Sequence, residues 1–95
     1  MAELGRCAEH LYKTVEYMAV NSGTPREKLQ GIPYDKRAAG FCSMAADHFP
    51  PGPLREKYQA IKLNVDTDEE ARTVIEQICE LSDDVARAVG RAEKT

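Results

Sequence analysis

Apolar residues recur at alternating three- and four-residue spacings through the last third of the chain. They form one continuous row, made of Ala71, Val74, Ile78, Leu81, Val85, Ala88 and Ala92. A second row lies beside the first, made of Ile75, Cys79, Ala86 and Val89. Together the two rows make an apolar arc that is wider than a two-stranded coiled coil needs. The pattern therefore predicts a long helix that packs against at least two neighbours.

The beginning of the chain carries a second helical pattern. Apolar side chains share one face of a helix from about Ala2 to Asn21, namely Leu4, Cys7, Ala8, Leu11, Val15, Met18 and Ala19. Asn21 and Gly23 are expected to end this helix, because both residue types accept the left-handed conformation that often closes helices.

A short second helix is expected to begin just after Thr24 and to end near Gly31. Thr24 is a suitable cap, and Pro25 fits the first helical position. Glu27 can reach back to the backbone of the cap, which completes a capping box.

The spacing from Pro33 to Phe49 predicts a further helical segment. Its inner face would carry Ala38, Phe41, Cys42, Ala45 and Phe49. Gly40 costs about 1 kcal/mol in helix propensity. We therefore expect Gly40 to serve close packing against another element.

Prolines break the chain between Phe49 and Pro53, and Pro53 is expected to begin another helix. Residues 61–65 are ambiguous, because Leu54, Tyr58 and Ile61 follow helical spacing, whereas Ile61, Leu63 and Val65 alternate with polar residues as in a strand. A lone strand has no partner in this chain. The helix is therefore favoured, with its last residues extended.

The final helix is expected to be capped by Thr67 or Asp66. Its charges suit the helix dipole, with Asp68, Glu69 and Glu70 in the first turn and Arg87, Arg91 and Lys94 near the end. These elements predict an all-α fold in which residues 1–95 form a single domain. The expected architecture is a four- to five-helix bundle whose long first and last helices run roughly antiparallel.

Charge is unevenly distributed along the chain. Net charge is −3, and the segment Met1–Val65 carries nine basic and seven acidic residues, whereas Asp66–Thr95 carries four basic and nine acidic residues. The acidic side chains of the last helix fall largely off its apolar row, namely Glu69, Glu76, Glu80, Asp83 and Asp84. Such a face suits the recruitment of a basic partner.

Other classes of partner have less support in the sequence. The chain has no basic stripe and no Trp, so direct binding of nucleic acid is not expected. It has neither a long apolar run nor a signal-like beginning, which favours a cytoplasmic protein with no membrane contact. Catalysis has no recognisable motif either, because Ser43 lacks a nucleophile elbow and no glycine-rich phosphate loop occurs.

The three cysteines, Cys7, Cys42 and Cys79, are odd in number and lie among apolar neighbours. We expect all three to be buried, reduced thiols. A zinc site formed from these cysteines with His10 and His48 is the alternative, but structural zinc usually draws on paired ligands in short loops. No metal and no cofactor are therefore expected.

The stretch His10-Leu11-Tyr12-Lys13-Thr14 resembles the His-x-Leu-Lys-Gly pattern of histidine phosphotransfer domains. The match covers His10 and Lys13, whereas Tyr12 stands in place of the leucine and Thr14 in place of the glycine. The resemblance implies a phosphotransfer domain centred on His10, which is the alternative function.

Apolar turns at the end of the last helix extend further than a compact domain of this size needs. We therefore expect a homodimer, with Val85 and Val89 at or near its interface. The function that the sequence favours is a non-catalytic protein-binding module, such as a small adaptor, regulator or inhibitor. It would act through the acidic helical surface on a partner that the sequence does not identify.

Overall fold

The computed structural model describes residues 4–94, with side chains described up to Arg91. Within this range the chain is helical and contains no strand, which confirms the all-α prediction. In chain order the elements are α1 (Leu4–Val20), α2 (Pro25–Gly31), the 3₁₀ helices η1 (Ala39–Ser43) and η2 (Ala46–His48), α3 (Pro53–Ala60) and α4 (Asp68–Lys94).

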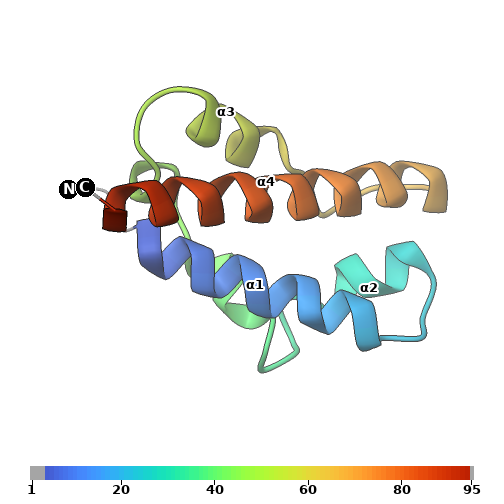
Figure 1. Ribbon diagram of the computed structural model, residues 1–95. Helices are drawn as coiled ribbons and strands as arrows, with labels where there is room; N and C mark the ends of the chain where they lie inside the picture. The colour runs from blue at the N-terminus through green and yellow to red at the C-terminus, as the bar shows by residue number, and fades with distance from the viewer. Residues whose placement is uncertain (1–3, 95) are drawn as a thin grey trace.

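The two long helices, α1 and α4, form the body of the molecule (Figure 1). They lie side by side, and the chain runs along α1 in one direction and along α4 in the other. The 27 residues of α4 span about 40 Å at the standard helical rise, which matches the longest dimension of the molecule, 41 Å. One helix therefore sets the length of the whole fold.

The apolar arc of α4 faces the rest of the chain, as its spacing predicts. The row is buried over most of its length, at Ala71, Val74, Ile78, Leu81 and Val85. Opposite it, α1 contributes Cys7, Leu11 and Met18 to the same core. The helix contacts α1, α2 and α3, so its wide apolar arc serves more than one neighbour.

The capping box predicted for α2 is present. The hydroxyl of Thr24 accepts a hydrogen bond from the N–H of Glu27 at 3.3 Å, and the carboxylate of Glu27 accepts one from the N–H of Thr24 at 3.2 Å. Buried Tyr17 of α1 donates its hydroxyl to the carbonyl of Lys28 at 3.0 Å. This bond ties the last turn of α2 to α1.

The segment after α2 differs from the predicted helix. It forms two short 3₁₀ helices. Phe41 of η1 is buried, as are the residues that flank η1, Ala38 and Met44, whereas Cys42 of η1 and Ala45 between the two helices are exposed. A 3₁₀ helix has three residues per turn, so positions three apart share its inner face. The α-helical spacing assumed from the sequence therefore placed Cys42 on the wrong side, and Ala45 is exposed because the backbone there is extended rather than helical.

Gly40 of η1 lies against the imidazole ring of His10, as expected for a glycine that permits close packing. A Cβ atom at Gly40 would overlap Nδ1 of that ring. The absence of a side chain here lets η1 approach α1 closely.

The proline-rich loop after η2 is held by α3. Gly52 precedes the helix with a φ of 124°, a backbone conformation that favours glycine. Phe49 is fully buried and stacks on Tyr58, with their ring centroids 4.6 Å apart. The guanidinium of Arg55 donates two hydrogen bonds, at 3.1 and 2.8 Å, to the carbonyl of Phe49. The loop is therefore anchored by one aromatic side chain and one backbone carbonyl.

The helix expected to continue into residues 61–65 ends earlier, at Ala60, so the non-helical part that was expected for its last residues covers the whole segment. In this segment Ile61, Leu63 and Val65 are half-buried against the core, and Lys62 and Asn64 are exposed. The alternating pattern thus marks a non-helical connection in which every second side chain is half-buried against the core. The following helix is capped by Thr67, whose hydroxyl accepts a hydrogen bond from the N–H of Glu70 at 3.1 Å.

Candidate functional site

The acidic residues of α4 fall into two groups on different sides of the helix. Glu80 and Asp84, four residues apart, lie on the side that packs toward α3. Glu69, Glu76 and Asp83 lie at seven-residue spacing on the outward side and are exposed. The surface predicted as one acidic face is therefore two surfaces with different neighbours.

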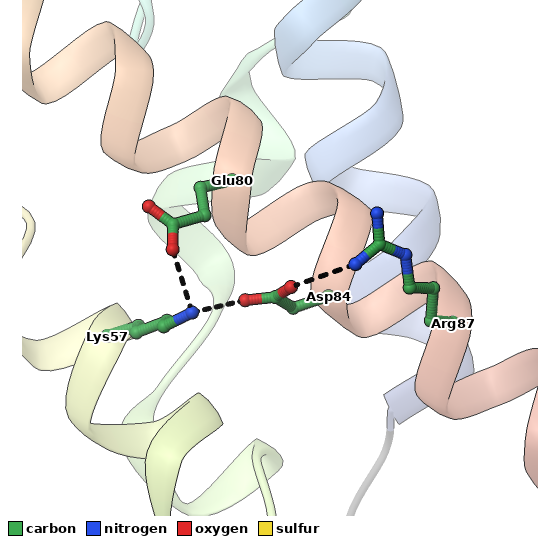
Figure 2. A network of polar contacts seen from close by, with 4 residues as sticks. All are labelled: Lys57, Glu80, Asp84 and Arg87. Carbon is green, nitrogen blue, oxygen red and sulfur yellow. Dashed lines mark hydrogen bonds and ion pairs between the residues drawn. The ribbon is translucent and has the colours of Figure 1, made fainter.

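The first group binds a cation of the chain itself (Figure 2). Lys57 of α3 places Nζ 2.9 Å from Oε1 of Glu80 and forms a second ion pair with Asp84. Arg87 approaches the other carboxylate oxygen of Asp84, with Nη1 at 3.8 Å. Only 24% of the Asp84 side chain is exposed, and each of its carboxylate oxygens has a cationic partner.

The hydrogen bonds to Asp84 and Glu80 raise the pKa of Lys57 above its usual value. Because folding raises this pKa, the stabilisation from the ion pairs is present at neutral pH. On the alkaline side it is lost as the pH rises through the folded-state pKa of Lys57. At physiological pH, Glu80 and Asp84 therefore serve the attachment of α3 to α4.

The second group has no such partner. Within the described part of the chain, no ion pair engages Glu69, Glu76 or Asp83. We name these three exposed side chains the outer acidic face. Their carboxylates are hydrated in the free protein. A cationic side chain of a partner can pair with them at the surface, where the desolvation cost is small.

Apolar surface adjoins the outer acidic face at Cys79. This side chain is half-buried, and burial raises the pKa of its thiol. The nearby carboxylates of Asp83 and Glu76 raise that pKa further, because they disfavour a second negative charge. Two members of the outer acidic face therefore flank an apolar patch of the same helix.

The residues proposed for a dimer interface have different surroundings. Val85 is fully buried within the single chain, whereas Val89 is half-buried. The expectation that the rest of the chain leaves the turn at Val85 uncovered is therefore wrong, because Val85 belongs to the hydrophobic core of the single chain. The dimer stays a prediction. Of the two residues, only Val89 has exposed surface that could contribute to its interface.

The prediction that all three cysteines are buried is also wrong. Cys7 is buried at 1% exposure, but Cys79 is half-buried and Cys42 is exposed. The thiol of Cys7 points toward the carbonyl of His48, with Sγ 3.9 Å from the oxygen. Among the described residues, no three His, Cys, Asp or Glu side chains are grouped so that they could hold a metal ion.

Thiol labelling of the native protein is expected to separate the three cysteines. Cys42 should react with Ellman's reagent at once because it is exposed. Cys79 should react slowly, since half-burial and a raised pKa both limit its thiolate, and Cys7 should react only after unfolding. Stopped-flow absorbance with Cys42→Ser as the control checks the order. A fast phase that survives in Cys42→Ser would contradict it.

His10 lies on the side of α1 that packs against η1. It is half-buried, and the Nδ1–Cε1 edge of its ring faces Gly40. Its neighbour Lys13 forms an ion pair with Glu9 at 3.0 Å. The lysine that would steady a phosphoryl group on His10 thus already has a carboxylate partner one turn away.

Comparison with known proteins gives no homologue from which to transfer a function. No family model matches the sequence, and neither a curated protein nor a solved structure gives a significant match. Among the described residues, no helix is long and apolar enough to cross a membrane.

Sequence reasoning missed the role of Lys57. The lysine pairs with residues 23 and 27 positions further along the chain, and no local pattern connects them. It also missed the exposure of Tyr12, which is 64% exposed beside the apolar face of α1. Helical spacing could have predicted this exposure, because Tyr12 lies one residue outside the core row of α1.

Proposed function

We propose that this protein is a non-catalytic protein-binding module, an adaptor, regulator or inhibitor, that recruits a basic partner through the outer acidic face of α4. The observation that carries the proposal is the division of the acidic residues. Glu80 and Asp84 form ion pairs with Lys57, whereas Glu69, Glu76 and Asp83 are exposed without an ion pair in the described chain.

Two further features support a binding role. The outer acidic face lies on a helix fixed along most of its length by buried side chains, so it is presented in one orientation without an ordering cost. It also adjoins half-buried apolar residues, and protein interfaces commonly combine an apolar centre with a charged rim.

Affinity purification with a matched pair of variants tests the proposal. We expect the bait Glu76→Gln/Asp83→Asn to lose basic proteins that the parent protein retains at low ionic strength. The control Glu80→Gln/Asp84→Asn removes the same number of charges from the same helix, but on the side that binds Lys57. It should retain those proteins, as long as circular dichroism shows that both variants are folded. Equal retention by all three baits would refute a role for the outer acidic face.

The competing hypothesis is histidine phosphotransfer at His10. It predicts that a small phosphodonor labels the parent protein but not His10→Gln, as read by mass spectrometry under alkaline conditions that preserve phosphohistidine. Our proposal expects no labelling of either protein. Stoichiometric labelling of the parent protein that His10→Gln abolishes would favour the competing function.

A further inference from the structure

One side of the α1–α4 pair is left without a covering element. On α1 it carries Ala8, Tyr12 and Val15, and on α4 it carries Cys79, Ala86 and Val89; we name these six residues the open flank. Tyr12 is 64% exposed, Ala86 is exposed, and the other four are half-buried. On α1 the open flank follows three- and four-residue spacing beside the core row. On α4, Cys79 and Ala86 are seven residues apart and half-buried Ser82 lies between them in the same row, so the strip is apolar except at this serine.

The contacts of both helices show why this side stays open. On α1, His10 packs against Gly40 and Tyr17 bonds to Lys28, so the side of α1 opposite the open flank receives η1 and α2. On α4, the side that holds Glu80 and Asp84 receives α3. Because the helices run in opposite directions, the remaining sides face the same way. No other described segment passes in front of the middle of this pair in Figure 1.

The open flank has an acidic rim. On α4, Glu76 and Asp83 lie next to Cys79, close enough to raise the pKa of its thiol. On α1, exposed Glu16 lies one turn beyond Tyr12, and Glu9 lies one turn before it, paired with Lys13. Two exposed arginines of α4 lie one turn from these acids: Arg72 before Glu76, and Arg87 after Asp83, which approaches Asp84 on the α3 side. The carboxylates of Glu76 and Asp83 are therefore the charges next to Cys79, and Glu16 is the acidic side chain without an ion pair in the described chain on the α1 edge.

From this combination we infer that the open flank binds an amphipathic helix of a partner protein, with its apolar side on the strip and Lys or Arg along its edges. The inference rests on the proposed function and specifies the partner. Ala8, Ala86 and Cys79 have small side chains, which let a third helix approach the pair closely. Tyr12 supplies an exposed aromatic anchor of the kind that often dominates binding energy.

A second copy of this chain suits the same strip poorly. Two-fold pairing through the open flank would bring Glu16, Glu76 and Asp83 against acidic side chains of the other copy. Like charges at an interface disfavour association. Lys or Arg side chains of a basic helix would instead form ion pairs with the same carboxylates. Charge complementarity therefore favours a basic helix over a second copy of this chain.

The test uses a synthetic helical peptide of about 18 residues, about 27 Å long as a helix. Its apolar residues form one side and its lysines flank them, and an isomer of the same composition has the apolar residues scattered. In an NMR titration of the full chain, we expect the amphipathic peptide to bind about tenfold more tightly than the isomer. The shifted amides should cluster at Ala8–Val15 and Cys79–Val89.

Two matched substitutions locate the contact. Ala86→Arg places a bulky cation on the open flank and should weaken peptide binding about tenfold or more. Ala60→Arg makes the same change at an exposed helical position on α3 and should leave binding unchanged. Tyr12→Ala should also weaken binding, and circular dichroism confirms that each variant is folded.

Three results would overturn the inference. Equal binding of the two peptides would mean that charge alone is recognised, which leaves the proposed function intact. Chain-mass doubling by light scattering, with concentration-dependent shifts on the open flank in the absence of peptide, would assign the strip to a second copy. Absence of shifts on the open flank at saturating peptide would reject it as the binding surface. The proposed function is tested separately, by affinity purification with the Glu76→Gln/Asp83→Asn bait.

Discussion

Leu81→Ala is expected to lower the free energy of unfolding by about 2 to 5 kcal/mol. Leu81 is fully buried midway along α4, and its neighbours in the same row, Ile78 and Val85, are also fully buried. Truncation removes contacts on every side, and these packed neighbours can close the cavity only in part. Because a small domain is stabilised by only about 5 to 15 kcal/mol, this one change removes a large share of the total.

Urea unfolding followed by circular dichroism measures this effect. The control is Arg72→Ala, an exposed position on the same helix where alanine favours helix formation, and its stability should change by less than about 0.5 kcal/mol. An unchanged midpoint for Leu81→Ala would mean that the apolar row of α4 is not packed in the isolated chain.

Gly31→Ala is expected to destabilise the protein by about 1 to 3 kcal/mol, although the same change in an open helix is stabilising. Gly31 is the last residue of α2, and a Cβ atom there would overlap the hydroxyl oxygen of Tyr17. The tyrosine ring is rigid and buried, with 3% exposure, so the hydroxyl has no free direction in which to move. The clash also separates the hydroxyl from the carbonyl of Lys28, to which it donates.

A double-mutant cycle with Tyr17→Phe gives the decisive comparison. Tyr17→Phe alone should cost about 0.5 to 1.5 kcal/mol through the lost hydrogen bond. In Gly31→Ala/Tyr17→Phe the clashing oxygen is gone, so the double variant should be more stable than the sum of the single effects predicts. Additive effects, or a stabilising Gly31→Ala, would show that α2 is not held against α1 through this contact.

The two long helices were predictable because their information is local. Burial along α4 follows from the spacing of apolar residues in one segment, and the row from Ala71 to Val85 is buried as expected. The start of α2 was equally local, since Thr24 and Glu27 are three residues apart and their bonds form within one turn. Gly40 was correctly assigned to close packing, because glycine in a helical segment needs a compensating contact.

The connection between α3 and α4 was misassigned because two periods fit the same residues. Ile61 belongs to the helical row of Leu54 and Tyr58 and also begins the alternation with Leu63 and Val65. The tertiary structure decides for the alternation, since the non-helical segment packs all three of these side chains partly against the core. The absence of a strand partner had favoured the helix, but partial burial of the three apolar side chains does not require such a partner.

The division of the acidic surface also required the tertiary structure. The sequence by itself determined that α4 would carry acidic residues away from its apolar row, because a helix separates side chains by their angle around its axis. Only the fold determined that α3 would pack on one side of α4 and bring Lys57 to Glu80 and Asp84. The fold likewise exposed Cys42 and enclosed Val85. Local spacing fixes which side chains share a face, but which face meets another element depends on contacts between distant segments.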